Sequence, residues 1–210
     1  MITRPQISNA KNTRQRILTA AEQIFATKGF QAMTLREVTQ QAKVNLAAVN
    51  YHFGSKSGLV REVIGARIRP INAERLRQLD QLKAEYGQAP IPIELIFESL
   101  IRPLFQYAAE SNFPQLAGRT MSDPSTFVRS MHKEFFMDLS IRYMQELQIS
   151  CPHLDTDTVK FRFFLAVSTM VGSIMDQIRL ENLFGSKLDP AKLDRVVDEL
   201  ISFIAAGFKQ

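Results

Sequence analysis

Residues 34–56 read TLREVTQQAKVNLAAVNYHFGSK, a pattern that predicts two short helices joined by a tight turn. Thr34 is suited to cap the first helix, and Glu37 stands three residues further on, where its carboxylate can reach back to the backbone N–H of the cap. Apolar residues follow at helical spacing and predict one buried stripe, made of Leu35, Val38 and Ala42. Two helices separated by so short a turn must cross steeply, which is the geometry of a helix-turn-helix.

The second helix of this pair has the side chains expected of a DNA-reading element. Lys43 and Val44 interrupt the first apolar pattern, and Asn45 is suited to cap the second helix. Its apolar side is formed by Leu46, Val49 and Phe53, and its outward positions hold Ala47, Asn50, Tyr51 and His52. These outward side chains are small or hydrogen-bonding, which suits a helix that enters the major groove of DNA. The alternative is that two short helices simply pack within an all-helical domain.

The charge distribution favours the DNA-binding interpretation. Residues 1–61 contain nine Lys and Arg but only two acidic residues, whereas the remainder contains 17 basic and 19 acidic residues. A basic N-terminal part on a slightly acidic body is an electrostatic footprint for a polyanion, and nucleic acid is the polyanion that fits it best.

Residues 12–58 resemble the DNA-binding domain of the TetR family of dimeric transcriptional regulators. The resemblance rests on the order of NTRQRILTAAEQIFATKGF and MTLREVTQQAKVNLAAVNYHFGSKSGL, with a first helix that ends at Gly29 and a closing stretch at residues 51–56. It implies an all-α protein with an N-terminal three-helix helix-turn-helix domain that binds DNA. It also implies a larger C-terminal helical domain that binds a ligand and dimerises.

The resemblance assigns roles within the motif. By the resemblance, Arg36 would reach a base edge. Bases would also be contacted by Leu46, Ala47 and Asn50. Phosphates would be contacted by Thr34, Tyr51, His52 and Lys56. With the turn residue and the second cap, the candidate DNA-binding residues are Thr34, Arg36, Lys43, Asn45, Leu46, Ala47, Asn50, Tyr51, His52 and Lys56.

Two of these positions depart from the family's pattern. The family often has Gly where Lys43 stands, and a left-handed backbone there costs a non-glycine residue about 1 kcal/mol. The family also often has an aromatic residue at the position of Asn50. Because Asn can form two hydrogen bonds with adenine, the base preference of the family does not carry over to this chain.

The expected domain organisation is a flexible N-terminal arm at 1–11, the DNA-binding domain at 12–58 and the ligand-binding and dimerisation domain at 59–210. Ser55 is suited to cap the helix that joins the two domains, and Pro70 should kink or split that helix. Further helices are expected near 93–110, 113–120, 124–148, 155–183 and 189–207.

The middle helices are rich in Phe and Met, which fill irregular core space and also line adaptable apolar cavities. Core packing accounts for most of them, but the family resemblance implies a pocket for a small hydrophobic ligand, such as a fatty acyl chain or an aromatic compound. Arg119 and His132 could pair with an acid group of that ligand, or be solvated or salt-bridged. The candidate pocket residues are Phe97, Leu104, Phe105, Arg119, Met131, His132 and Phe135.

The last two helices are also apolar along one face. They can complete the core of the monomer or pair with their symmetry mates in a four-helix interface, and the resemblance favours the second. The candidate interface residues are Phe164, Ser168, Val171, Gly172, Met175, Val197, Leu200, Ile201 and Ile204.

Enzymatic or metal chemistry finds little support. The three histidines are scattered without paired-ligand spacing, and we expect no catalytic residues, no metal site and no cofactor. Cys151 is the single cysteine, so an internal disulfide is excluded and a reducing cytosol is the natural compartment; a redox role stays open. The apolar run of residues 163–175 is too short to span a bilayer, and the N-terminus lacks an apolar signal core, so we expect neither membrane insertion nor secretion.

The resulting hypothesis is a cytoplasmic homodimer that represses transcription from a near-palindromic DNA operator and leaves it when a small hydrophobic ligand binds. Two alternatives stay open. One is a helical small-molecule or lipid-binding protein without specific DNA binding, and the other is a sequence-neutral architectural DNA-binding protein.

Overall fold

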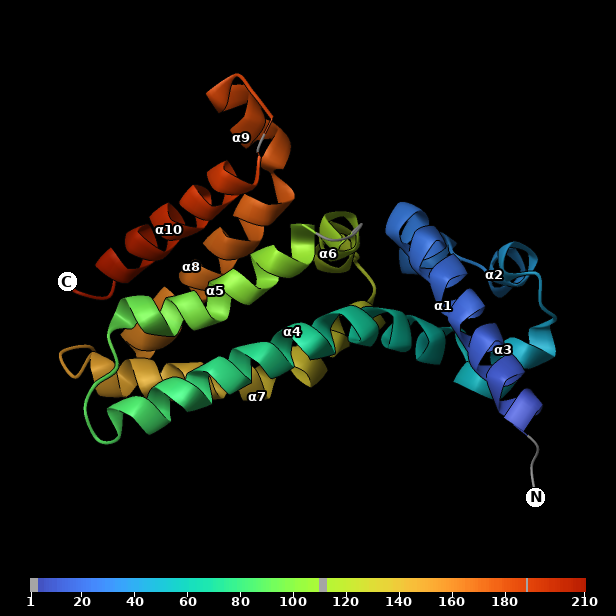
Figure 1. Ribbon diagram of the computed structural model, residues 1–210, viewed down its shortest axis with the longest axis horizontal. Coiled ribbons are helices and arrows are strands. Elements are labelled where there is room, and N and C mark those ends of the chain that lie inside the picture. Colours follow the sequence, from blue (N-terminus) through green and yellow to red (C-terminus); the bar gives the residue numbers. More distant parts are fainter. Residues whose placement is uncertain (1–3, 110–112, 188) are drawn as a thin grey trace. The chain divides into compact units, whose positions relative to one another are not determined.

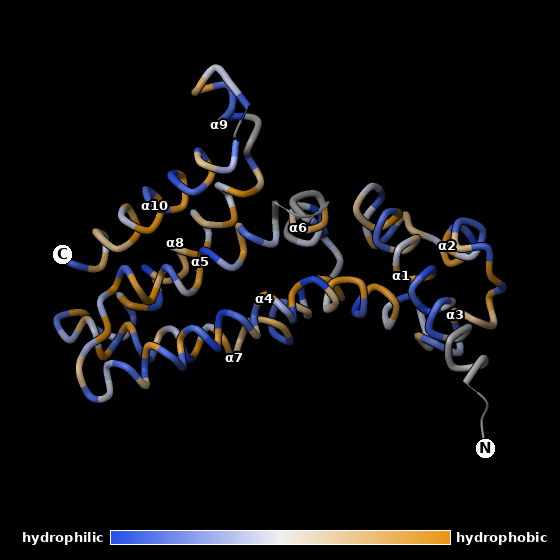
Figure 2. Tube along the Cα trace, viewed as in Figure 1, coloured by the Kyte–Doolittle hydropathy of each residue, from blue (hydrophilic) through white to orange (hydrophobic). Residues whose placement is uncertain are grey.

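The computed structural model describes residues 4–109, 113–187 and 189–210, and within these ranges all regular structure is helical (Figure 1). In chain order the helices are α1 (Arg4–Ala32), α2 (Leu35–Ala42), α3 (Leu46–Phe53), α4 (Lys56–Tyr86), α5 (Ile93–Ala109), α6 (Phe113–Ser122), α7 (Thr126–Ser150), α8 (Thr156–Met175), α9 (Gln177–Phe184) and α10 (Pro190–Ala206). Hydrophobic and hydrophilic positions alternate along most of them, as Figure 2 shows, so one side can be buried while the other meets water. The prediction of an all-α fold is confirmed.

The chain divides into two compact units. The first comprises the described residues up to Arg69 together with Gln115–Phe135, and the second comprises the described residues of Pro70–Pro114 and Phe136–Gln210. The first unit is therefore larger than the domain predicted from the sequence to end at residue 58. Burial explains the addition, because Leu116, Val128 and Met131 lie in the same apolar core as the residues of the motif.

Within the first unit, α1 supplies a long surface on which the motif packs. Ile17, Ala21 and Phe25 recur at helical spacing and are fully buried. The helix is interrupted at Gly29, whose φ of 76° and ψ of 178° are accessible to glycine but strained for other residues. Residues 4–11, predicted as part of a flexible arm, are helical, and residues 1–3 of that arm lie outside the described residues.

The helix α4 belongs to both units. It is capped by Ser55, whose hydroxyl accepts a hydrogen bond of 3.0 Å from the N–H of Gly58, and it continues through Pro70 without being split. The division between the units falls at Pro70 within α4 and between Phe135 and Phe136 within α7.

In the second unit, α5 packs against α10 and also contacts α8. The helix predicted at 155–183 is in fact two helices, because Asp176 leaves the helical conformation (φ −111°, ψ 41°) and its side chain accepts a hydrogen bond from the N–H of Arg179. Asp176 thus ends α8 and caps α9.

By length and apolar composition, α8 is the one helix among the described residues that could cross a membrane. From the sequence we expected no apolar run long enough to span a bilayer, whereas α8 is long and apolar enough to do so. The buried residues of α8 follow a helical stripe along one side: Val159, Phe163, Ala166, Met170 and Ile174.

Candidate nucleic-acid interface

The start of α2 is a complete capping box. The Thr34 hydroxyl accepts a hydrogen bond of 3.2 Å from the N–H of Glu37, and the Glu37 carboxylate accepts one of 3.1 Å from the N–H of Thr34. Lys28 on α1 adds a bond of 2.5 Å to the same carboxylate. The hydrogen bonds from Lys28 and Thr34 lower the pKa of Glu37 to about 2, so the carboxylate is charged at neutral pH. The capping box predicted from the sequence is confirmed.

The turn between α2 and α3 depends on one strained residue and one distant cation. Lys43 has left-handed backbone angles (φ 52°, ψ 52°), and its N–H donates to the carbonyl of Gln40. The Arg16 guanidinium on α1 donates to the carbonyls of Ala42 and Lys43 at 2.5 Å and 2.8 Å. A cation at the end of a helix satisfies carbonyls that have no partner within the helix. Sequence reasoning missed Arg16, since no local pattern connects it to the turn.

One side of α3 is buried in the core of the first unit, and the other side is exposed. Asn45 caps α3 by accepting a hydrogen bond of 2.9 Å from the N–H of Ala48, as predicted, and Val49 and Phe53 are buried in the core of the unit. By contrast, Leu46 is 51% exposed and Tyr51 is 84% exposed. Leu46, expected to share the apolar side of α3, instead lies at its surface. The exposed residues of α3 are Leu46, Ala47, Asn50 and Tyr51.

Two further candidate residues are held by aromatic contacts. The ring of half-buried His52 meets the ring of Tyr51 edge-on, with their centroids 5.0 Å apart. The Lys56 ammonium lies 4.6 Å from the centroid of the Phe30 ring and donates to the carbonyl of Gln31 at 3.3 Å. These contacts fix the Lys56 charge beside the end of α1, and Phe30 and Gln31 are positioning residues that the sequence did not reveal.

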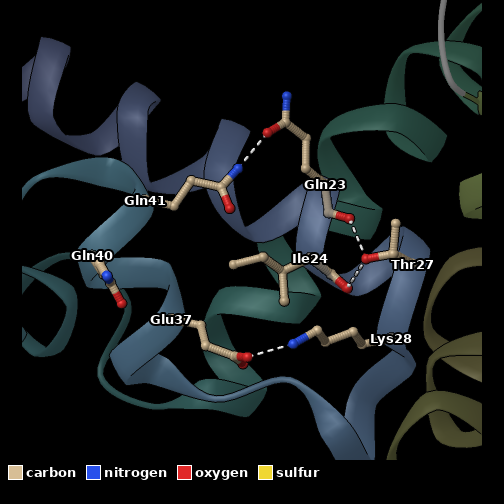
Figure 3. Close-up of a pocket in the computed structure, with 7 residues that line it drawn as sticks. All are labelled: Gln23, Ile24, Thr27, Lys28, Glu37, Gln40 and Gln41. Atoms are coloured by element: carbon tan, nitrogen blue, oxygen red, sulfur yellow. Dashed lines mark hydrogen bonds and ion pairs between the residues drawn. The ribbon is translucent and has the colours of Figure 1, made fainter.

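An open groove between α1 and α2 is occupied by pairs of its own side chains (Figure 3). Gln41 donates to Gln23 across the groove, and Lys28 pairs with Glu37. Because both pairs join α1 to α2, they contribute to the rigidity of the motif. Its lining residues are Gln23, Ile24, Thr27, Lys28, Glu37, Gln40 and Gln41.

Taken together, these contacts hold a two-turn helix whose outer face carries an amide, a phenol and two small or apolar side chains. Such a face can enter the major groove and hydrogen-bond base edges, while neighbouring cations meet the phosphates. Arg36 is exposed on α2, Thr34 and Lys43 lie at the two ends of α2, and Lys56 is the first residue of α4. The structure therefore places the ten candidate DNA-binding residues on one continuous segment of the first unit.

The seven candidate pocket residues do not share a unit. Phe97, Leu104 and Phe105 are buried in the second unit, and the other four belong to the first: Arg119, Met131, His132 and Phe135. The Arg119 guanidinium donates to the carbonyl of Thr27 at 2.8 Å, so it ties α6 to α1. Burial lowers the pKa of His132, which favours its neutral form. These observations place Met131 and Arg119 in the first unit.

The nine candidate dimer residues also fall into two groups. On α10 the four predicted residues are buried within their own unit, where α10 packs on α5: Val197, Leu200, Ile201 and Ile204. These four complete the monomer core and leave no surface for a partner. On α8, Phe164 is 66% exposed and Met175 is 44% exposed. Ser168, Val171 and Gly172 recur with them at helical spacing and are exposed or half-buried, so the α8 face stays available.

Comparison with known proteins gives two family matches. Residues 17–63 match the family described as bacterial regulatory proteins, tetR family, and residues 98–207 match the family described as Tetracyclin repressor-like, C-terminal domain. The second match alone covers more than half of the chain.

Among curated proteins, the chain is similar to YttP of Bacillus subtilis (strain 168), named a probable HTH-type transcriptional regulator. The two are 34% identical over 129 residues, which cover 60% of this chain and 58% of YttP. It is also similar to the HTH-type transcriptional repressor BepR of Brucella suis biovar 1 (strain 1330), with 29% identity over 103 residues, covering 49% of this chain and 46% of BepR. The chain thus spans about half the length of the curated relatives it matches.

Among solved structures, the fold is similar to that of SmeT in its complex with triclosan. The TM-score is 0.66 at 20% sequence identity, and the alignment covers 92% of this chain and 90% of SmeT. This likeness extends over both units, and with the two family matches it leads to one conclusion. The chain belongs to the TetR family of bacterial regulatory proteins.

Proposed function

We propose that this protein is a sequence-specific DNA-binding transcriptional repressor. The observation that carries the proposal is the outer face of α3, where Tyr51 is 84% exposed while Val49 and Phe53 on the opposite side are buried. An exposed Tyr and Leu on a rigid short helix have no evident role in the monomer, but they suit contact with a base-pair edge and a phosphate. BepR, a relative by sequence, is named a repressor, which supports repression rather than activation.

The motif residues divide by the kind of contact they suit. Asn50 can form two hydrogen bonds with adenine, and Arg36 can reach a guanine edge, so these two would read sequence. Phosphates, which position the protein without reading sequence, would be contacted by Thr34, Tyr51, His52 and Lys56. Lys43 and Asn45 would support those contacts from the end of α2 and the start of α3.

The protein would act as a cytoplasmic homodimer, with two copies of α3 reading two half-sites of a near-palindromic operator. The exposed face of α8 supports the dimer, since its residues from Phe164 to Met175 have apolar or small side chains in a helical stripe. A dimer would also make specific binding much tighter than one short helix allows.

A small hydrophobic ligand would release the protein from its operator. The complex of SmeT, a structural relative, with triclosan supports a ligand of this kind in this fold. Because α4 and α7 contribute to both units, a ligand that alters their packing in the second unit can change the free energy of the DNA-binding form.

The test is fluorescence anisotropy with the DNA upstream of the protein's own gene and with a scrambled duplex of equal length, across a salt series. We expect a preference of at least about a thousandfold for the native duplex and a steep salt dependence for both. If the upstream DNA shows no preference, selection from random duplexes supplies the operator. Equal affinity for all selected duplexes would instead establish an architectural protein, and absence of binding at low salt would favour the ligand-binding alternative.

Three variants separate the roles. Asn50→Ala should lose about 1–3 kcal/mol of operator binding and relax the preference at one base pair. Lys56→Ala should weaken binding to operator and scrambled DNA alike and reduce the salt slope by about one. Arg129→Ala removes an exposed cation of the same unit outside the motif, so it serves as the charge-matched control for Lys56→Ala.

A further inference from the structure

A charged side chain is buried in the core of the second unit. Arg75 on α4 is 3% exposed, and its hydrogen-bond partners are neutral groups. Its Nε donates to the carbonyl of Leu100 at 2.7 Å, one terminal nitrogen donates to the Asn72 amide oxygen at 3.2 Å, and the other reaches the Met170 sulfur at 3.7 Å. Arg75 therefore joins α4 to α5 and α8.

No carboxylate neutralises this guanidinium among the residues that the structure describes. The contacts of Arg75 are with a backbone carbonyl, an amide and a thioether. The Tyr143 hydroxyl carries no charge at pH 7, because burial raises its pKa to about 12. Burial lowers the pKa of Arg75 to about 10, so the side chain is still protonated at pH 7. A buried cation without a counter-ion is unusual in protein cores, because the lost hydration is normally replaced by an ion pair.

Pro103 in α5 does not account for the position of Arg75. Pro103 lacks a backbone N–H, which leaves the carbonyl of Ser99, four residues earlier, without its usual helical donor. Arg75 donates instead to the next carbonyl, that of Leu100. A neutral donor would satisfy that carbonyl equally well, so this contact does not explain why a permanent charge lies here.

The weakest partner of Arg75 is also the most replaceable. A thioether sulfur is a poor acceptor, and methionine is an unbranched side chain that readily changes rotamer. If the Met170 side chain moves aside, an anionic oxygen can take its place at the terminal nitrogens. The second unit also holds buried apolar side chains of the kind that accommodate a hydrocarbon or aromatic body, among them Ile71, Phe97, Leu104, Leu139 and Phe163.

We propose that the effector of this protein is an apolar organic anion, a carboxylate in the simplest case, whose charged group pairs with Arg75 in place of Met170. The inference rests on the proposed function, because it names the chemical class of the ligand that releases the operator. The anion supplies a counter-charge that the described partners of Arg75 do not provide, and its entry changes contacts of α4, the helix that continues into the first unit. A planar guanidinium suits a carboxylate because both of its terminal nitrogens can donate at once.

The experiment compares two carboxylates with their neutral twins on the full-length protein at pH 7.5. The pairs are dodecanoate with dodecanol and 2-naphthoate with 2-naphthylmethanol, used below their micellar concentrations. Binding is measured by calorimetry, and release of the selected operator duplex is measured by anisotropy. We expect at least one carboxylate to bind about tenfold or more tightly than its neutral twin and to release the duplex at lower concentration.

Arg75→Met should abolish that difference between carboxylate and neutral twin. Its unfolding midpoint should fall only moderately: the Leu100 carbonyl and the Asn72 amide oxygen lose a donor, but no orphaned partner charge is left. Arg77→Met is the matched control: it changes the same residue type two positions along α4, where the guanidinium is exposed and paired with Glu74. If Arg75→Met does not fold, Arg75→Lys keeps the charge but loses the planar donor pair, and it should retain a reduced preference.

The outcomes distinguish this inference from the proposed function. Equal binding of carboxylates and neutral twins, or a carboxylate preference that survives in Arg75→Met, overturns the anion proposal while the operator preference stands. A protein without any duplex preference overturns the proposed function, whatever the amphiphile measurements give.

Discussion

The carboxylate of Asp123 accepts a hydrogen bond of 2.8 Å from the backbone N–H of Phe30, 93 residues earlier in the chain. Its other oxygen accepts one of 2.9 Å from the N–H of Ser125 at the start of α7. The N–H of Phe30 follows Gly29, where α1 leaves the helical conformation. One buried carboxylate thus joins the end of the motif's supporting helix to the turn between α6 and α7.

Asp123→Asn should destabilise the first unit by about 1–3 kcal/mol, because an amide cannot accept hydrogen bonds on both sides as a carboxylate does. The Phe30 amide should exchange with deuterium faster, and the urea midpoint should fall. Asp138→Asn, at an exposed position of α7, is the control. Unchanged exchange at Phe30 would show that the contact contributes nothing.

Lys43→Gly should raise the free energy of unfolding by about 1 kcal/mol, because glycine adopts the left-handed conformation observed at φ 52° without strain. Urea unfolding measures the gain. Lys43→Ala is the matched comparison, since it removes the same charge but keeps the strained backbone. A Gly variant less stable than the Ala variant would contradict this explanation. Both variants should bind operator with a smaller salt slope if Lys43 contacts a phosphate.

The pH dependence of stability should include a contribution from Glu37. Its pKa is about 2 in the folded protein against an ordinary value of 4.5, so the unfolded chain takes up the proton first. The stabilisation is therefore fully present above about pH 4.5 and is lost as the pH falls toward 2. Urea midpoints measured between pH 7 and pH 2.5 should converge for the native protein and Glu37→Gln at the acid end.

The control for that series is Glu85→Gln, which changes an exposed glutamate of α4. Its midpoint should run parallel to that of the native protein over the whole range. A constant gap between the native protein and Glu37→Gln down to pH 2.5 would mean that the Lys28 and Thr34 contacts do not depress the pKa of this carboxyl.

Phe164→Glu should convert the proposed dimer to a monomer. Phe164 is 66% exposed on α8, and burying a charge there against a second copy would weaken association by at least about tenfold. Sedimentation velocity reports the mass, and circular dichroism should show an unchanged helix content because the side chain is exposed in the monomer. Ile149→Glu, at a 53% exposed position of α7, should stay dimeric. A dimeric Phe164→Glu would place the interface elsewhere.

The features that could be predicted from the sequence are those whose cause lies within a few residues. The capping box of Thr34 and Glu37 and the Asn45 cap are local hydrogen-bond patterns, and both are present. The buried sides of α2 and α3 follow from periodicity, apart from Leu46, which lies in the first turn of α3 and is half exposed. A helix break at Asp176 was also marked locally by a capping residue, but the apolar pattern on both sides concealed it.

Contacts between distant residues could not be predicted in this way. Nothing near Arg16 indicates that it completes the end of α2, and nothing near Asp123 indicates a partner in α1. The apolar stripe of α10 has the same periodicity whether it faces α5 or a second subunit, so the sequence left its role in the dimer open. Burial of Val197 and Ile204 in the monomer decides the matter for those side chains.

The inclusion of Gln115–Phe135 in the first unit limits how DNA-binding domains can be exchanged between relatives. The tetR family match ends at residue 63, so a chimaera designed from that match would transplant the motif without Asp123 and Arg119. The N–H of Phe30 and the carbonyl of Thr27 would then meet foreign side chains. Recombination that preserves folding in this protein must carry two separate segments of the gene together, so the DNA-reading part is inherited as an interrupted module.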